Sequence, residues 1–192
     1  AGRSMGTFGE DCAAKYNFTR DAQDKFAMAS VQRAQDAIKN GAFKDEIAPV
    51  TVKDRKGERV VDTDEGPGKI NIDKIPTLKP AFKKDGTVTA ASSSSINDGA
   101  AALVMMREST AKQLGVKPLA RVVSHATHAQ EPEWFSTAPI GATEKALKKA
   151  GWQVSDVDLW EINEAFAVVP MALMHELKVP HDKVNVNGGA CA

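Results

Sequence analysis

The stretch VDLWEINEAFAVVPMALMHEL, residues 157–177, contains the pattern that decides the fold. Its first six residues, 157–162, are mostly apolar, which is typical of a strand. After Asn163, apolar side chains recur three or four positions apart, as on one face of a helix. Asparagine is a favoured helix cap, so we expect a strand, a cap at Asn163 and then a helix. Pro170 falls inside that helix, where we expect a kink because proline cannot donate to the preceding turn.

The residues on either side of this stretch continue the alternation. Residues 118–123 indicate a strand, and residues 137–150 indicate a helix with Thr137 as its cap and Gly151 as its stop. A further strand is predicted at residues 183–187. Strands that alternate with helices through short links predict a layered α/β domain whose sheet is covered by helices.

The first sixty residues indicate two helices and two short strands. The first helix is expected at residues 5–16, and the second after Thr19, whose hydroxyl can accept from free amides of the next turn. The pair Asn40-Gly41 supplies the stop of the second helix. Strands are predicted at residues 47–52 and 59–61, joined by a turn at residues 56–58.

Residues 62–96 form a long irregular stretch that contains several glycine and proline turns and ends in four serines. Such a stretch inside a compact domain is uncommon and is usually functional or disordered. Its spaced isoleucines favour a loop that packs on the domain, whereas the serines favour a flexible spacer, and the residues alone leave both open. The apolar run 100–106 follows and leads into a helix that ends at Gly115.

Composition excludes several classes of protein. The 192 residues contain 25 Lys and Arg and 25 Asp and Glu, so no net charge attracts nucleic acid or an acidic membrane. No apolar run reaches the roughly 20 residues that span a bilayer, and no signal segment opens the chain. Two cysteines are too few for a disulfide framework, so we expect a reducing, cytoplasmic location. The sequence starts without Met and stops after a glycine pair, so we expect either a trimmed terminus or the middle of a longer protein.

Few side chains indicate chemistry on their own. Cys12 and Cys191 have no basic neighbour that would activate them, so we expect small buried thiols. His125 and His128 stand near the end of a predicted strand, where this spacing points the two rings to opposite faces. No second cluster completes a four-ligand set, and no metal site is expected.

Two pairs of residues have both a structural and a functional interpretation. Asn163 and Glu164 stand where a strand ends and a helix begins, the usual position of ligand sites in α/β sheets, but they also suit a plain cap and an acid that opposes the helix dipole. Lys69 and Lys74 could hold a phosphate, although solvated lysines are commoner. The residues alone therefore predict an α/β domain joined to a loop-rich segment, with no mechanism.

Three motifs stand in order along the chain, at residues 87–102, 160–167 and 184–190, and together they resemble those of the thiolase family. The string TVTAASSSSINDGAAA at residues 87–102 is similar to the family's T-V-T-A-x-N-A-S-x-x-N-D-G-A-A-A, WEINEAFA at residues 160–167 to its N-E-A-F motif, and VNVNGGA at residues 184–190 to its N-x-N-G-G-A. The resemblance covers essentially the whole chain. It implies the layered α/β thiolase fold, with residues 1–96 as a loop domain over coenzyme A, 97–117 as the end of the N-terminal core half and 118–192 as part of the C-terminal half.

The resemblance also implies a reaction, namely the Claisen condensation of two acetyl-CoA to acetoacetyl-CoA, or its thiolytic reverse, through a cysteine acyl-enzyme. Coenzyme A thioesters are then the substrate, with no prosthetic group and no metal. The family places its nucleophilic cysteine upstream of residue 1, and its G-H-P histidine and acid/base cysteine downstream of residue 192. We therefore expect the chain alone to be inactive, and the full-length protein to be a homodimer or homotetramer.

The resemblance carries over to ten residues of this chain. Asn163 would hold the water that serves one oxyanion hole. The hydroxyl of Ser94 would bond the pantetheine arm. The remaining positions are Ala90 and Ser93 in the same channel, Phe82 and Phe166 as apolar walls, Met5 and Phe135 at the border of the acyl pocket, and Lys69 and Lys74 near the phosphates of the nucleotide.

Some positions depart from the family pattern. Ser92 stands where asparagine is usual, and Ser93 and Ser95 stand where alanine and often glycine are usual, which leaves the acyl-chain preference open. Two other functions stay open as well: a degradative 3-ketoacyl-CoA thiolase of longer chains, and a non-catalytic module that binds coenzyme A or a protein. An isolated half-core should leave apolar faces uncovered, so we expect the chain to be poorly soluble.

Overall fold

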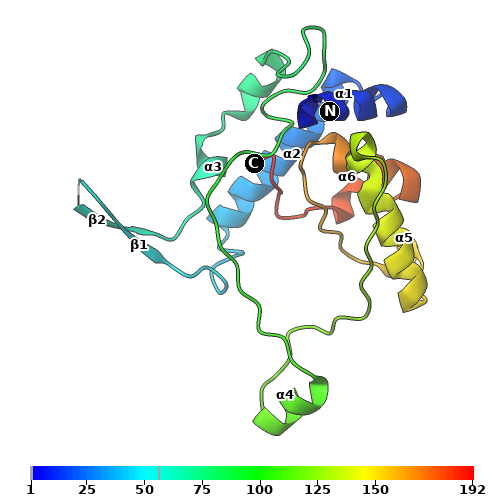
Figure 1. Cartoon of the computed structure of the whole chain (residues 1–192). Coiled ribbons are helices and arrows are strands. Elements are labelled where there is room, and N and C mark those ends of the chain that lie inside the picture. The colour runs from blue at the N-terminus through cyan, green and yellow to red at the C-terminus, as the bar shows by residue number, and fades with distance from the viewer. Residues whose placement is uncertain (1, 56) are drawn as a thin grey trace.

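A computed structural model describes residues 2–55 and 57–192. Most helices gather in one body, while a hairpin and one short helix project from it (Figure 1). The body contains α1 (Met5–Tyr16), α2 (Arg20–Lys39), α3 (Glu65–Lys69), α5 (Ala138–Ala150) and α6 (Val168–Leu177); the projecting elements are β1 (Val50–Asp54), β2 (Gly57–Val61) and α4 (Glu108–Leu114); and the 3₁₀ turns are η1 (Ile72–Thr77), η2 (Pro132–Thr137), η3 (Val154–Asp156) and η4 (His181–Lys183).

Helices α1 and α2 form where the local signals predict them. The hydroxyl of Thr19 accepts a hydrogen bond of 3.1 Å from the amide of Ala22, which confirms the predicted cap. Gly41, which follows the cap residue Asn40 at the end of α2, adopts a φ of +68°, a conformation that glycine reaches without steric cost. The aligned amides at the start of α2 also favour the nearby carboxylate of Asp21.

Helix α6 lies at the centre of the body because nearly all of its side chains are apolar, and such a helix is stable only when it is covered on every side. One side contacts α1, a second contacts α2, and a third contacts the extended segments around Trp160 and Val184. These three clusters contain Val168, Val169 and Ala172 with Cys12 and Ala13; Met171 with Phe26, Ala27 and Cys191; and Leu173 with Trp160, Ile162, Val179 and Val184.

The long stretch 62–96 packs on α2 along its first part. Ile75 of η1 is 1% exposed and lies in one cluster with Val31 and Ala34 of α2. The guanidinium of Arg20 donates to the carbonyl oxygen of Leu78 at 2.7 Å, which fixes the end of η1 to the start of α2. The interpretation as a packed loop is therefore confirmed for this part. The flexible spacer that the serines favoured is wrong, because the amides of Ser94 and Ser95 donate to the carbonyl oxygens of Ala165 and Ala190.

The predicted hairpin is present, with shifted ends. Strands β1 and β2 pair antiparallel with Val50 opposite Val61. Residues 47–49, which we expected to begin the first strand, are not part of it, and Pro49 has no amide to donate to a partner. Lys56, the first residue of the predicted turn, lies outside the described residues.

Three strands predicted in the second half are wrong. Residues 118–123 are extended but exposed, and no strand lies beside them in the part of the chain that the structure describes. Residues 157–162 and 183–187 meet in a single parallel bridge, between Trp160 and Val184. A strand forms only when a neighbour satisfies its amides and carbonyls, so an apolar segment without one stays irregular.

The helix that follows Asn163 begins later than predicted. Helix α6 starts at Val168, with Ala167 in the cap position, so Asn163 is not the cap. Pro170 is thereby the third residue of the helix, and the predicted kink is wrong as well. The first four amides of a helix have no partner within it, so a proline there removes no hydrogen bond.

Helix α5 follows the predicted range, but its cap differs. Thr137 occupies the cap position without bonding the helix, because its hydroxyl donates to the carbonyl oxygen of Trp134 and accepts from Gln130. Gly151 ends the helix at a φ of +70°, and Gly115 ends α4 at +66°, as predicted. Among the described residues, no helix is both long and apolar enough to cross a membrane.

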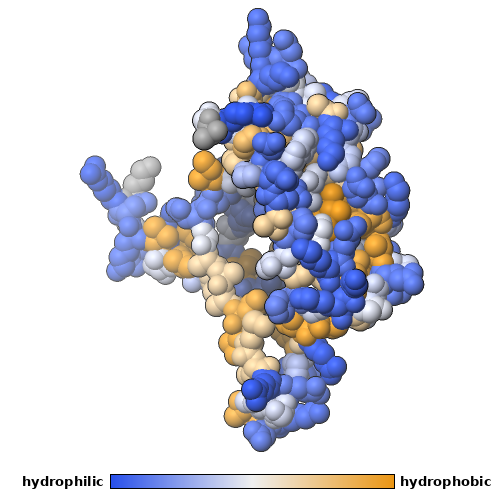
Figure 2. Space-filling model, turned by 45° about the vertical axis from the view of Figure 1, so that its right-hand side comes forward, coloured by the Kyte–Doolittle hydropathy of each residue, from blue (hydrophilic) through white to orange (hydrophobic). Residues whose placement is uncertain are grey.

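The segment that leads to α4 exposes large apolar side chains. Ile96, Leu103, Val104 and Met105 are between 71% and 102% exposed, and Figure 2 shows apolar residues along the chain that descends to α4. We call residues 96–106 the apolar strap. A contiguous exposed apolar surface favours association, because contact between copies removes it from water.

We therefore expect the isolated chain to self-associate through the apolar strap. Replacing both Leu103 and Val104 with lysine should shift the chain toward the monomer in sedimentation velocity. The double change Ser109→Lys and Gln113→Lys, which adds the same two charges at exposed positions of α4, should not. A wild-type chain that sediments as a monomer at all concentrations would contradict this prediction.

Candidate active site

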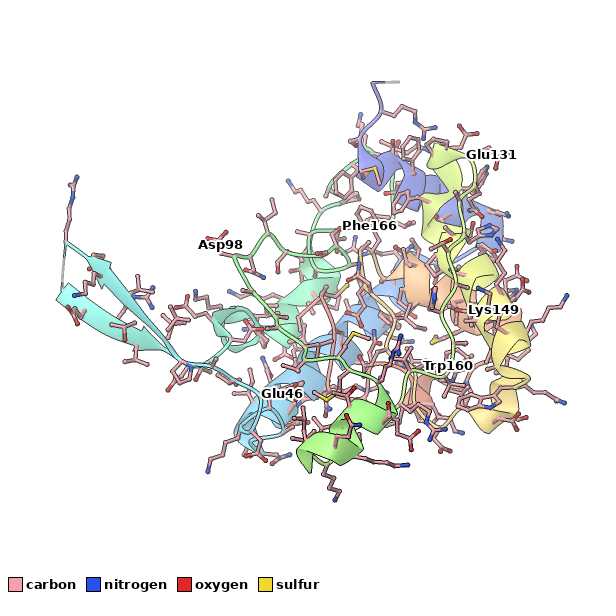
Figure 3. All side chains as sticks on the ribbon, turned by 60° about the horizontal axis from the view of Figure 1, so that its bottom comes forward. Glu46, Asp98, Glu131, Lys149, Trp160 and Phe166 are labelled. Carbon is pink, nitrogen blue, oxygen red and sulfur yellow. The ribbon has the colours of Figure 1, made fainter. Side chains whose placement is uncertain are left out.

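Asn163 lies at the mouth of a cavity that is largely apolar. It follows the extended segment that ends at Ile162, and its side chain is exposed. The cavity has a volume of about 280 Å³ and is lined by Phe135, Pro139, Thr143, Trp160, Glu161, Ile162, Asn163, Ala165, Val169 and Leu173. Figure 3 labels Trp160 and Phe166, which stand before and after Asn163 in the sequence. The pKa of the Glu161 carboxyl is raised, first by partial removal from water and then by the negative charge of Glu164.

The backbone before Asn163 is held by the side chain of Asn185. The Oδ1 atom of Asn185 accepts from the amide of Ile162 at 2.7 Å, and its Nδ2 donates to the carbonyl oxygen of the same residue at 2.8 Å. The backbone amide of Asn185 also donates to the carbonyl oxygen of Trp160 at 2.8 Å. Segments 160–162 and 184–185 are thereby joined without a regular sheet.

The residue after Asn163 is a fully buried acid. The Oε1 atom of Glu164 accepts from Nδ2 of Asn185 at 2.8 Å, and its Oε2 accepts from the hydroxyl of Ser30 at 2.7 Å and from the amide of Cys191 at 2.9 Å. A buried carboxylate is stable only when several donors face it. Glu164 therefore ties the site to α2 and to the C-terminal residues, which is more than the dipole role expected for it.

The serine run is brought next to Phe166. Ser93 and Phe166 form an antiparallel bridge. The amide of Ser94 donates to the carbonyl oxygen of Ala165 at 3.1 Å, and the amide of Ala167 donates to the carbonyl oxygen of Ser92 at 2.9 Å. Residues 165–167 are thus used in pairing, which is why the helix cannot start at Asn163. The hydroxyl of Ser93 donates to the carbonyl oxygen of Thr89, while Ser94 and Ala90 are exposed.

Aromatic rings surround Phe166. The rings of Phe82 and Phe135 meet it edge-on, with centroids 5.8 Å and 6.3 Å away. Phe82 also covers Gly6, where an added Cβ would lie 2.1 Å from the ring, and Met5 beside it is half exposed at the start of α1. The structure therefore brings the predicted apolar residues of the acyl site together, while their roles stay predictions.

The two predicted phosphate ligands, Lys69 and Lys74, make no hydrogen bond to this aromatic group or to its neighbours among the described residues. The ammonium of Lys69 pairs with the carboxylate of Glu65 at 2.8 Å and is 71% exposed. Lys74 lies in η1 and is exposed. An exposed ion pair of this kind contributes little to stability, so Lys69 remains free to exchange its partner.

Glu10 is a site residue that the sequence did not reveal. Its buried carboxylate accepts from the amides of Thr87 and Val88 at 2.9 Å, and also from the hydroxyl of Thr87. It thereby fixes the start of the segment that contains Ala90 and the serines. No local signal sets Glu10 apart in the sequence, because the next residue, Asp11, is also an acid.

Both thiols are buried, as predicted. Cys12 is 0% and Cys191 4% exposed. Burial raises the pKa of Cys12, although the neighbouring Ser136 and Lys15 oppose this effect, and burial together with the charge of Glu164 raises the pKa of Cys191 well above its ordinary value of 9.0. Within residues 2–55 and 57–192, no three His, Cys, Asp or Glu side chains form a group that could hold a metal.

We expect the two thiols to react slowly in the folded chain. At neutral pH, labelling with a maleimide should be at least about tenfold slower than in urea, because only the thiolate reacts. Because the pKa of each thiol is higher in the folded chain than in the unfolded chain, keeping the thiols protonated stabilises the fold. This contribution is fully present below about pH 9. It is lost as the pH rises through the folded pKa, since the unfolded thiols ionise first. Mass spectrometry of the labelled chain would measure the labelling rates, and equal rates in the folded and unfolded chain would contradict the prediction of slow reaction.

Comparison with known proteins identifies the class. A family model described as "Thiolase, N-terminal domain" matches residues 1–109, and one described as "Thiolase, C-terminal domain" matches residues 116–192. The crystal structure of the Bacillus anthracis acetyl-CoA acetyltransferase superposes with a TM-score of 0.95 at 43% identity, covering 98% of this chain and 48% of that one. The α/β fold class is therefore confirmed, and the chain belongs to the thiolase family.

Curated relatives agree with this assignment. A Dictyostelium discoideum protein named "Probable acetyl-CoA acetyltransferase" is 54% identical over all 192 residues, which are 46% of its length. The "Acetyl-CoA acetyltransferase" of Thiocystis violacea is 50% identical and the "Probable acetyl-CoA acyltransferase" of Staphylococcus aureus (strain COL) 48% identical, each over 98% of this chain. The chain spans about half the length of these relatives. The domain boundaries predicted at residues 96 and 117 stay predictions.

Proposed function

We propose that this chain forms the coenzyme-covering segment and one oxyanion-binding element of an acetyl-CoA acetyltransferase. The observation that carries the proposal is the position of Asn163, exposed at an apolar cavity and next to the paired segments 92–94 and 165–167. The names of the relatives support acetyl-CoA as the substrate. Coenzyme A thioesters bind as substrates in this proposal, with no prosthetic group.

In the proposed reaction a cysteine thiolate attacks the thioester carbonyl of the first acetyl-CoA and releases the coenzyme thiolate. A base then removes an α-proton from the second acetyl-CoA, and the resulting enolate attacks the acyl-enzyme and expels the cysteine. The side-chain amide of Asn163 would hold a water, and this water would donate to the thioester oxygen as negative charge develops on that oxygen. Cys12 and Cys191 have no part in these steps, because both are buried with raised pKa values.

The other residues would bind the substrate. The hydroxyl of Ser94 donates to the neighbouring carbonyl oxygen of Ser95. It is exposed and can turn to the pantetheine amide. Phe82, Phe135 and Phe166 would exclude water from the acyl end. Lys69 and Lys74 would approach the phosphates of the nucleotide.

The same proposal includes a cytoplasmic enzyme that assembles as a homodimer or homotetramer. Free buried thiols suit a reducing compartment. The exposed apolar strap suits burial within the complete protein.

A chimera tests the proposed function. Residues 1–192 replace the matching segment of the Bacillus anthracis enzyme, and acetoacetyl-CoA thiolysis is measured for the chimera and for the isolated chain. We expect turnover by the chimera alone, with kcat lowered about 10²- to 10³-fold by Asn163→Ala. Turnover by the isolated chain, or a labelled acetyl group trapped on Cys12 or Cys191, would overturn the assignment.

Two outcomes separate the alternatives. A chimera that prefers 3-ketoacyl-CoA of longer chains over acetoacetyl-CoA would support the degradative thiolase. A folded chimera that binds coenzyme A and does not turn over would support a binding module. Circular dichroism of the chimera serves as the control for folding in both cases.

A further inference from the structure

We propose that Asn185 is a positioning residue for Asn163, acting together with the buried carboxylate of Glu164. The inference rests on the proposed function, in which the direction of the Asn163 amide decides where its water lies. No hydrogen bond holds the side chain of Asn163 to another described residue, so the backbone on either side of it must set that direction.

One side chain holds both neighbours of Asn163. Asn185 bonds the amide and the carbonyl of Ile162 and also donates to Glu164. All these bonds are between 2.7 Å and 2.8 Å, and all lie in the buried part of the molecule. The residues before and after Asn163 are therefore fixed relative to each other through a single amide group.

Asn185 itself is held in an unusual conformation. Its φ of +46° lies in the left-handed region, which is strained for most non-glycine residues and persists only where the surroundings enforce it. Its carbonyl oxygen accepts from the amide of Gly188 at 2.9 Å, which closes the turn. Asparagine is one of the few residues that tolerate this region and also carry both a donor and an acceptor.

Glu164 gives this arrangement its rigidity. Its second oxygen is bonded by Ser30 of α2 and by Cys191, and the hydroxyl of Ser30 also accepts from the amide of Gly189 at 2.9 Å. The loop of Asn163, the glycine turn and α2 therefore share one hydrogen-bonded group. A small displacement of α2 would therefore move Glu164, and with it the adjacent Asn163.

A double-mutant cycle in the chimera tests the inference. Asn185→Ala should lower kcat roughly tenfold to a hundredfold with KM changed less than about twofold, because it misplaces a group that acts in the transition state. In the Asn163→Ala background the same change should have little further effect. A merely structural role would lower kcat by the same factor in both backgrounds, and that result would overturn the inference.

Asn17→Ala is the matched control. Asn17 is an exposed asparagine at the end of α1 with a φ of +56°, so its replacement introduces the same backbone strain without touching the site. We expect its kcat to equal that of the unmodified chimera. If Asn163→Ala itself leaves the chimera fully active, the proposed function fails. If both single variants lower kcat but their effects are independent, only the inference about Asn185 fails.

A second pair of variants covers the case in which Asn185→Ala does not fold. Asn185→Asp places a carboxylate against Glu164, and Glu164→Gln in the same chain supplies a donor to it. The double variant should recover kcat at least about fivefold over Asn185→Asp alone, because a paired contact replaces two repelling carboxylates. A double variant no more active than the single one would overturn the inference.

Discussion

Gly189→Ala is expected to destabilise the chain by at least about 3 kcal/mol. A Cβ at this position would lie 2.4 Å from the carboxyl carbon of Glu164. The carboxylate cannot move away without losing its bonds to Ser30, Asn185 and Cys191. The substitution therefore either breaks a buried hydrogen-bonded group or displaces the whole turn.

Urea denaturation followed by circular dichroism, at matched low protein concentration, measures this effect. Gly68→Ala is the control, because Gly68 lies in α3 with nothing within 4 Å of an added Cβ. That change should be neutral or stabilise by up to about 1 kcal/mol, since alanine favours helix. Equal stability of Gly189→Ala and the wild-type chain would show that the Glu164 contacts are not formed as described.

Leu173→Ala is expected to cost about 2–5 kcal/mol of stability. Leu173 is 1% exposed and packs with Trp160, Ile162 and Val184, the side chains that join α6 to the extended segments. Removing the isopropyl end of its side chain leaves a cavity beside the proposed site. Leu114→Ala is the matched control in α4, where the leucine is 64% exposed and the loss should stay within about 0.5 kcal/mol. Equal losses at the two positions would contradict the described core.

The features that the sequence predicted correctly depend on neighbours in the chain. The cap at Thr19 and the stops at Gly115 and Gly151 need only the adjacent turn, and all three are present. The strand at residues 118–123 needs a partner in space, and among the described residues it has none. Apolar, β-branched composition alone therefore predicted an element that its surroundings do not support.

The site shows the same division. The motif around Asn163 led to the thiolase family, but its local interpretation as a helix cap was wrong, because residues 92–94 pair with residues 165–167. The contact between Ser30 and Glu164 joins residues 134 positions apart, and no spacing rule indicates it. The glycine pair after Asn185 was the one visible signal of a tight turn at that point.

The position of α2 has a consequence for the integrity of the chain. This helix touches η1 on one side and the residues around Met171 and Cys191 on the other, whereas the apolar strap runs outside the body (Figure 1). A protease that cut the strap once would therefore release neither product. The two pieces would remain a single particle, held by buried side chains, and would separate only in denaturant.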